Sequence, residues 1–201
     1  GIVKGNAPFI LLGSIRREED EKILQTVRKL VSTRPDCIIG LFPKHIERAD
    51  LWVERLKQED IRTIKRSNAR GVQPPGTVIV WDVFGELAGA YALAATTFVG
   101  GSLINLGGQN FLEPLVFGLR PIIGPYWKNF AWVGREIIDA GLVHEVEDEN
   151  QLVSALLRSL ESRDDRDEVI TKVQDFFEPR KGGTRQVCLA IIDKLLAGEK
   201  N

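Results

Sequence analysis

Short apolar runs alternate along this chain with longer stretches in which apolar residues recur every three or four positions. The first pattern predicts buried strands and the second predicts amphipathic helices. We expect strands at 9–12, 37–42, 61–64, 78–80, 97–99, 121–123 and 142–146. We expect helices at 18–32, 47–58, 84–94, 110–117, 131–140, 149–160, 165–177 and 183–196.

Strands that alternate with helices indicate a mainly parallel sheet with helices on both faces, which is the Rossmann-like α/β class. The chain is expected to form one such domain over residues 1–201, with 165–201 as a helical C-terminal extension. Ligands of these sheets bind beyond the C-terminal ends of the strands. Polar or glycine-bearing segments follow four of the predicted strands, at 13–14, 43–45, 82–86 and 100–113. We therefore expect these four segments to converge at one edge of the sheet.

The segment at 100–113 is the most informative part of the sequence. A buried strand ends in Gly100-Gly101, a second glycine pair follows, and an apolar helix is predicted to begin at Asn110. Asn110 stands at the N-cap position with Glu113 three residues later, as in a capping box. A strand, a glycine loop and a helix N-terminus often hold a phosphate, because free amides and the helix dipole face the anion. Ser14 is expected to cap the helix at 18–32 in the same way.

Composition and charge exclude several classes of protein. The chain carries 27 Lys and Arg against 28 Asp and Glu, so a nucleic-acid partner is not expected. No apolar run has the length of a membrane span, and no signal peptide opens the chain. Cys37 and Cys188 lie in apolar stretches, which favours buried reduced thiols and a cytosolic protein. The chain has no methionine, so we expect Gly1 to be a cut point in a longer protein.

Five ordered motifs resemble the C-terminal half of the transferases of 3-deoxy-D-manno-octulosonic acid (Kdo). The motifs are Gly13-Ser14 with the acidic run at 18–20, then the segments at 42–48, 82–87, 98–114 and 124–130. The resemblance implies a GT-B glycosyltransferase that moves Kdo from CMP-Kdo to a lipid A precursor in lipopolysaccharide biosynthesis. It covers essentially the whole chain but only the donor-binding domain. The N-terminal acceptor domain is therefore expected to be absent from this chain.

The resemblance also implies site residues, partners and a location. The donor-binding residues it implies are Gly13, Ser14, Pro43, Lys44, His45, Phe84, Gly85, Glu86, Ser102, Gly107, Gly108, Gln109, Asn110 and Glu113. No catalytic residue is expected here, because the family's carboxylate base lies in the acceptor domain. No metal or other cofactor is expected, and CMP-Kdo is the donor substrate. The whole enzyme is expected to be cytoplasmic, at the cytoplasmic face of the inner membrane of a Gram-negative bacterium.

This sequence departs from the family pattern at three places. Lys44 replaces the usual arginine of Pro-Arg-His, so a point charge stands where a bidentate fork is usual. Gln109 and Phe111 replace the histidine and proline of Gly-Gly-His-Asn-Pro-Leu-Glu. In the segment 82–87, Val and Phe replace the usual Thr and Met.

Each charged site residue has a structural explanation beside the functional one. Lys44 is expected at the donor phosphate or the Kdo carboxylate, and the alternative is a solvated surface lysine. Glu113 is expected to bind the two ribose hydroxyls, and it can also serve as a helix cap. His45 can simply fix its turn, and the helix dipole alone favours Glu86. Trp52 and His144 are predicted to be packing residues.

Two other functions stay open at the level of sequence. The first is a domain of a UDP-sugar GT-B transferase or epimerase, which also places a glycine loop and a glutamate at its nucleotide. Competition between CMP and UDP separates that function from Kdo transfer. The second is a non-catalytic nucleotide-binding or association module, which gains support if the natural chain has no upstream domain.

Overall fold

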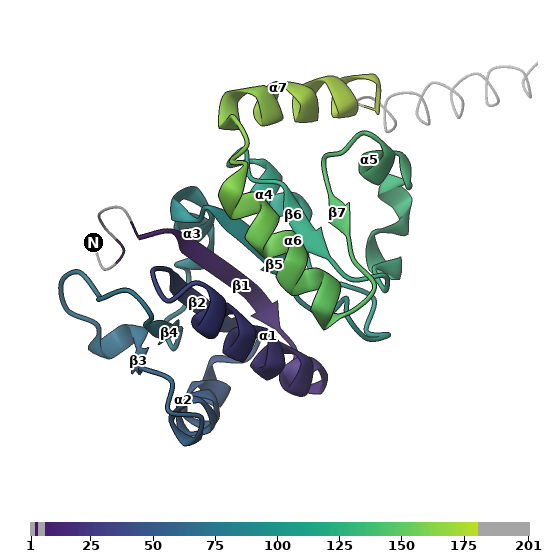
Figure 1. The fold of residues 1–201 in the computed structure, drawn as a ribbon. Coiled ribbons are helices and arrows are strands. Elements are labelled where there is room, and N and C mark those ends of the chain that lie inside the picture. Colours follow the sequence, from purple (N-terminus) through teal and green to yellow (C-terminus); the bar gives the residue numbers. More distant parts are fainter. Residues whose placement is uncertain (1–2, 4–6, 181–201) are drawn as a thin grey trace, which may run out of the picture.

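A single parallel sheet organises the computed structural model, which describes residue 3 and residues 7–180 (Figure 1). Its strands are β1 Phe9–Ile15, β2 Ile38–Pro43, β3 Thr63–Lys65, β4 Val78–Val80, β5 Thr96–Val99, β6 Pro121–Ile123 and β7 His144–Glu145. They lie in the order β3-β4-β2-β1-β5-β6-β7, and neighbouring strands are parallel. The predicted Rossmann-like class is confirmed.

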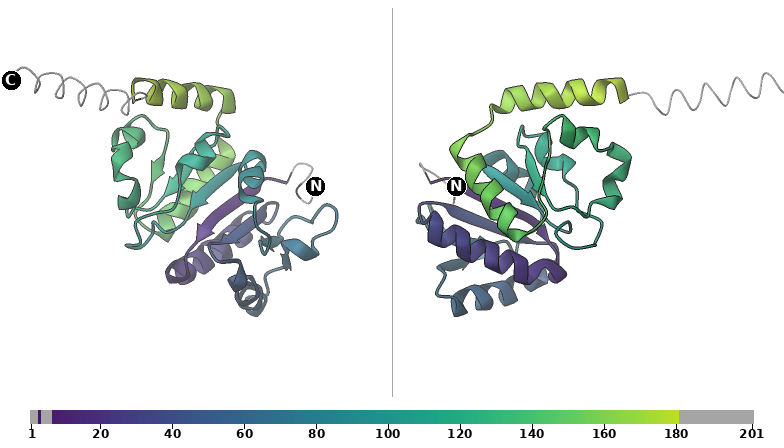
Figure 2. Two further views of the ribbon diagram at one scale, coloured as in Figure 1. Left: turned by 180° about the vertical axis from the view of Figure 1, so that it is seen from behind. Right: turned by 45° about the vertical axis from the view of Figure 1, so that its right-hand side comes forward.

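Helices cover both faces of this sheet, as the views from the front (Figure 1) and from behind (Figure 2) show. The helices are α1 Asp20–Thr33, α2 Ala49–Gln58, α3 Leu87–Leu93, α4 Leu112–Leu115, α5 Glu136–Asp139, α6 Glu149–Glu161 and α7 Arg166–Phe177. Short 3-10 helices are η1 Arg17–Glu19, η2 Ile46–Arg48, η3 Arg66–Asn68, η4 Lys128–Val133 and η5 Glu178–Arg180. The helix predicted at 183–196, and with it Cys188, lies outside the described residues.

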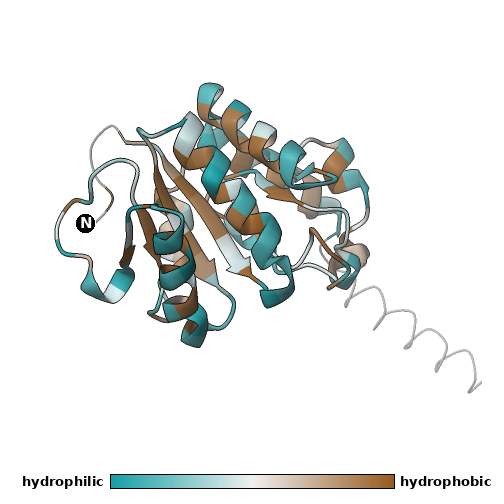
Figure 3. Ribbon diagram, turned by 60° about the horizontal axis from the view of Figure 1, so that its bottom comes forward, coloured by the Kyte–Doolittle hydropathy of each residue, from teal (hydrophilic) through white to brown (hydrophobic). Residues whose placement is uncertain are grey.

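The period-two alternation of the strands sends successive side chains to opposite faces of the sheet. Ile10 and Leu12 of β1 belong to the core beneath α1, α2 and α6, whereas Phe9 and Leu11 belong to the core beneath α3. Figure 3 shows the result as apolar strands beneath helices whose outward sides are polar. A third core, between β5, β6, α4, η4 and α5, completes the far half of the sheet.

Two packing predictions have opposite outcomes. Trp52 is 0% exposed in the core under α2, as predicted. His144 lies in β7 but is exposed, because β7 is an edge strand, so its prediction as a packing residue is wrong. Cys37 is buried and unpaired, in agreement with its prediction as a reduced thiol.

Local differences from the predicted elements have identifiable causes. Ser14 is not a helix cap, because it lies inside β1 with φ of 56°, and η1 begins only at Arg17. The helix predicted at 131–140 is split into η4 and α5 by Gly134, whose φ is 86°. The helix predicted at 110–117 shortens to the four residues of α4, and Gly118 turns the chain away with φ of 66°.

Candidate functional site

The four polar segments lie at one edge of the sheet, as the topology predicts. They lie at the C-terminal ends of β1, β2, β4 and β5, and these strands are consecutive neighbours in the order β4-β2-β1-β5. Backbone hydrogen bonds join the segments where the strands end: Lys44 N–H donates to Ile15 O at 2.8 Å, and Gly100 N–H donates to Gly13 O at 2.8 Å. The chain leaves β1 on one side toward β2 and returns on the other side as β5. The segments therefore meet at a topological switch point, where such sheets bind ligands.

Glu113 is the carboxylate best placed for a ligand at this edge. It is half-buried in the first turn of α4 and has no hydrogen-bond or ion-pair partner among the described residues. Close by, the hydroxyl of Tyr91 is buried and also lacks a hydrogen-bond partner. Burial, and then the charge of Glu113, raise the pKa of Tyr91, so this hydroxyl stays protonated and able to donate. A Cβ on Gly13 would lie 2.8 Å from the Tyr91 oxygen, which explains why β1 has a glycine at this position.

Lys44 and His45 extend the same edge beyond β2. Both side chains are exposed, and Lys44 has no side-chain partner among the described residues. The Nδ1 atom of His45 lies 3.7 Å from Glu47 Oε1. Pro43 before them is buried at the end of β2, and its part in donor binding stays a prediction. Lys44 therefore presents a free cation beside the end of β1.

Glu86 is already engaged by protein groups. Arg66 Nε and Nη2 donate to its two carboxylate oxygens at 2.7 and 2.9 Å, and Trp81 Nε1 donates to Oε2 at 2.8 Å. The charge-assisted bidentate pair holds the segment after β4 against η3. The neighbouring Phe84 is 77% exposed and Gly85 is exposed. Ligand contact stays a prediction for Phe84, Gly85 and Glu86. Phe84 and Gly85 have the exposed surface that such contact needs.

The glycine loop differs from its predicted role as a cradle of free amides. The carboxylate of Glu19, which is 0% exposed, accepts from Gly101 N at 2.5 Å, Ser102 N at 3.0 Å and Leu103 N at 2.9 Å. These three amides are therefore not available to a phosphate. The part of that prediction that concerns the first glycine pair is wrong, because an internal carboxylate occupies the anion position.

Ser102 is likewise occupied inside the protein. Its hydroxyl donates to Val99 O at 2.9 Å and accepts from Gly124 N at 2.8 Å, and the residue is 1% exposed. Its carbonyl accepts from Tyr126 N at 3.0 Å. Ser102 thus joins the glycine loop to the segment after β6, and direct donor contact from its side chain is not supported in this arrangement.

The second glycine pair is required by packing against the same segment. Gly107 and Gly108 have φ of 87° and 81°. A Cβ on Gly107 would lie 2.6 Å from the side-chain amide of Asn129, and one on Gly108 would lie 3.0 Å from Trp127 Cα. Asn129 N–H also donates to Gly107 O at 2.9 Å. These contacts explain why the motifs at 98–114 and 124–130 occur together.

We expect Gly107→Ala to destabilise the fold more than Gly85→Ala does. Gly85 has a similar φ of 81°, but a Cβ there meets no atom within 4 Å, so it reports backbone strain alone. Overlap with Asn129 adds about 1–3 kcal/mol to the loss of unfolding free energy. Urea denaturation of both variants measures the difference. Equal losses would show that Gly107 is required only for its backbone conformation.

Asn110 caps the next turn, although not as a complete capping box. Its Oδ1 accepts from Leu112 N at 3.2 Å, which places the cap one residue before the N-cap position Phe111. The carboxylate of Glu113 does not return this bond, and so it stays free. Gln109 is half-buried, with its side chain packed over Gly101. Asn110 and Gln109 thus fix the conformation of the segment that precedes Glu113.

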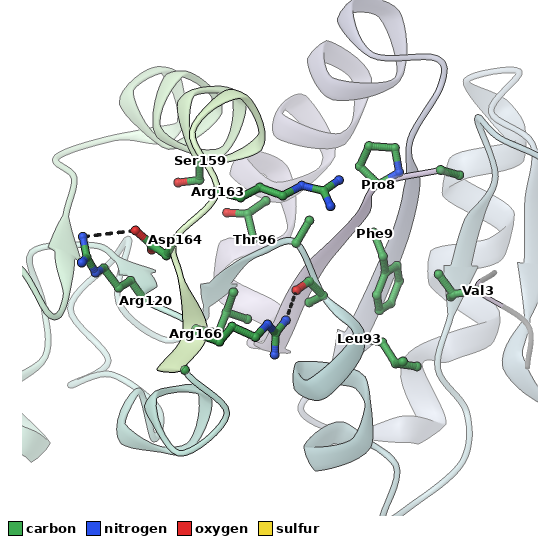
Figure 4. A pocket seen from close by; sticks show the side chains of 15 residues that line it. Val3, Pro8, Phe9, Leu93, Thr96, Arg120, Ser159, Arg163, Asp164 and Arg166 are labelled. Atoms are coloured by element: carbon green, nitrogen blue, oxygen red, sulfur yellow. Dashed lines mark hydrogen bonds and ion pairs between the residues drawn. The ribbon is translucent and has the colours of Figure 1, made fainter. Parts of the chain in front are cut away.

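A large cavity lies away from this edge. It has a volume of about 530 Å³ and opens at the opposite edge of the sheet, where β1 and β5 begin (Figure 4). There Arg166 donates to the carbonyls of Phe117 at 2.9 Å and Ala94 at 2.5 Å, and Arg120 pairs with Asp164. Arg166 thus ties the start of α7 to the segments that follow α3 and α4, and Arg120 keeps a buried Nε without a hydrogen-bond partner in the described part of the chain, beside its pair with Asp164.

Neither a metal centre nor a spanning helix is found in the part of the chain that the structure describes. No group of three or more His, Cys, Asp or Glu side chains there could hold a metal ion. None of the helices there is both long and apolar enough to cross a membrane.

Sequence reasoning missed four residues that build this edge: Glu19, Arg66, Tyr91 and Asn129. Each acts on residues at least 20 positions away, so periodicity does not indicate its role, although Glu19 lies in the acidic run of the first motif. The spacing that could have indicated Asn129 is its place in a motif that accompanies the glycine loop.

Comparisons with known proteins agree with this geometry. No protein-family model matches the sequence. The Kdo transferase of Haemophilus influenzae is 36% identical over 165 residues, which are 80% of this chain and 39% of that protein. The Kdo transferase of Aquifex aeolicus is 32% identical over 158 residues, 79% of this chain and 43% of that protein. The chain thus spans about two fifths of the length of these relatives.

Among solved structures, a glycosyltransferase of kitacinnamycin shares the fold, with a TM-score of 0.51 and 15% identity over 94% of this chain and 45% of that chain. The sheet and its switch point define the chain as a Rossmann-like domain, and its structural neighbours are glycosyltransferases. The C-terminal CMP-Kdo binding domain of WaaA from Acinetobacter baumannii matches with a TM-score of 0.77 and 28% identity, over 86% of this chain and 90% of that domain. The chain is a C-terminal domain of the Kdo transferase family.

Proposed function

We propose that this chain binds CMP-Kdo and forms the donor side of an enzyme that transfers Kdo to a lipid A precursor. The observation that carries the proposal is the match to the CMP-Kdo binding domain of WaaA, which extends over nearly the full length of both domains. The free carboxylate of Glu113 and the free cation of Lys44 at the sheet edge support it, since the donor offers two ribose hydroxyls and a phosphate.

The chemistry asked of the donor side is charge stabilisation. When CMP leaves, negative charge develops on its phosphate while the sugar gains oxocarbenium character. In this proposal Lys44 stabilises the leaving phosphate, and Glu113 holds the ribose by accepting from its hydroxyls. The base that deprotonates the acceptor hydroxyl belongs to an acceptor-side domain. The reaction proposed here uses no metal or other cofactor, and the whole enzyme works at the cytoplasmic face of the inner membrane.

We expect the chain to bind CMP more tightly than UMP or AMP. Isothermal titration with the three nucleotides measures this preference. The titration needs a high protein concentration, because a donor domain without its acceptor domain binds weakly. UDP serves as the competitor that represents the other GT-B enzymes. Binding of UDP in preference to CMP would favour the function of a UDP-sugar enzyme. Absence of all nucleotide binding would favour an association module.

A further inference from the structure

The carboxylate of Glu19 stands at the centre of the sheet edge without touching the open surface. It is 0% exposed and lies in η1, between the end of β1 and the start of α1. Besides three amides of the glycine loop, it accepts from Arg16 N at 3.3 Å. One side chain therefore joins the segment after β1 to the segment after β5. A buried carboxylate with four N–H donors is an internal substitute for a bound anion.

Backbone hydrogen bonds connect the residues held by Glu19 to the turn that carries Glu113. Gly101 O accepts from Gly108 N at 2.7 Å, and Gly100 O accepts from Gln109 N at 3.0 Å. The next residue, Asn110, caps the turn that carries Glu113. On the other side, Ser102 holds Gly124 and Tyr126 of the segment after β6. Displacement of 101–103 would therefore displace the turn in front of Glu113.

Charge, and not only shape, is needed at position 19. A carboxylate offers acceptors at both oxygens, whereas a glutamine offers one acceptor and turns an N–H₂ donor toward backbone N–H donors. A buried donor that faces other donors is left unsatisfied. Burial raises the pKa of the Glu19 carboxyl, while its bonds to the backbone amides of Gly101 and Leu103 act to lower it.

We propose that Glu19 is a positioning residue for donor binding: its carboxylate fixes the loop 100–110 and thereby the place of Glu113, without contact to the nucleotide. This inference rests on the proposed function. It assigns the glycine loop a role as the receptor of an internal anion, while the donor phosphate is left to groups outside residues 101–103.

The test compares Glu19→Gln with Glu19→Asp and with the control Glu21→Gln. Glu21 lies in the first turn of α1 with an exposed side chain paired to Arg55 at 2.5 Å, so its substitution removes a carboxylate without touching the loop. Titration with CMP is expected to show at least a tenfold loss of affinity for Glu19→Gln, and less than a twofold change for Glu21→Gln. Glu19→Asp keeps the charge but is shorter, and its affinity is expected to fall between them. If Glu19→Gln does not fold, the ordering of Glu19→Asp against the control decides the same question.

A second readout does not depend on nucleotide binding. Hydrogen exchange of the backbone amides can be measured by NMR. In Glu19→Gln we expect exchange at Gly101, Ser102 and Leu103 to be at least tenfold faster, with exchange in β1 and α6 unchanged. If the unsubstituted chain does not bind CMP but loop exchange is still faster in Glu19→Gln, the role of Glu19 in the loop is supported and the proposed function is overturned. A folded Glu19→Gln protein with unchanged loop exchange, or with wild-type CMP affinity, would overturn the inference.

Discussion

Replacing Glu113 by glutamine is expected to weaken CMP binding about ten- to a hundredfold while leaving the fold almost unchanged. Glutamine keeps the length and volume of the side chain but loses the charge that strengthens hydrogen bonds from the ribose hydroxyls. A hydrogen bond to a charged group contributes about 1.5–3 kcal/mol, and about 1.4 kcal/mol corresponds to a tenfold change in affinity. The helix cap is made by Asn110, so stability is expected to change by less than about 0.5 kcal/mol.

Titration calorimetry and thermal melting of the same preparation separate binding from stability. Glu54→Gln is the matched control, because Glu54 is an exposed glutamate on α2, away from the sheet edge. It should change neither quantity. A Glu113→Gln protein that melts several degrees lower and binds CMP normally would show that Glu113 serves the helix alone.

The second large effect concerns catalysis. We expect this chain alone to show no transfer of Kdo, and we expect activity when it is joined to an acceptor-side domain. In the joined enzyme, Lys44→Ala should lower the rate on the order of a hundredfold, because the leaving phosphate loses a cation. The salt dependence of donor binding should also flatten, since one charge pair is removed. The assay is transfer from freshly made CMP-Kdo to a lipid A precursor.

Lys57→Ala provides the control for a lost surface charge, because Lys57 is an exposed lysine on α2. It should leave the rate within twofold of the unsubstituted enzyme. Robust turnover by this chain alone, or a wild-type rate for Lys44→Ala in the joined enzyme, would contradict the role assigned to the donor side.

The order of the strands and helices could be predicted because each element carries its own periodicity. β4 has the bounds predicted for it, and α6 ends within one residue of its predicted end. The hydrophobic periodicity does not predict the ends of elements that are set by an unusual backbone conformation. Ser14 has the side chain of a helix cap, but its left-handed φ keeps it in the strand. Gly134 interrupts an otherwise helical pattern for the same kind of reason.

The place of the candidate site could be predicted from the sequence. Which of its polar groups are free, and which are hydrogen-bonded inside the protein, could not. Topology places segments at a strand end, and this was sufficient to bring Gly13, Lys44 and Glu113 to one edge. Which polar groups are free depends on partners that are distant in sequence. The sequence places both Glu86 and Glu113 at the donor, but Arg66, twenty positions before Glu86, holds the Glu86 carboxylate. The amides of Gly101 and Ser102 are likewise occupied by a residue more than eighty positions away.

The central place of β1 in the sheet has a consequence for folding kinetics. Its partner on one side is β2, which follows directly, but on the other side it is β5, and the Thr97 hydroxyl bond to Leu11 O spans 86 residues. Contacts across so long a loop form slowly, because the loop entropy is lost before the pairing is gained. The half-sheet of β1 to β4 can therefore assemble first, with β1 exposing an unpaired edge until β5 docks. The nucleotide edge, which needs both halves, is then among the last parts of the domain to form.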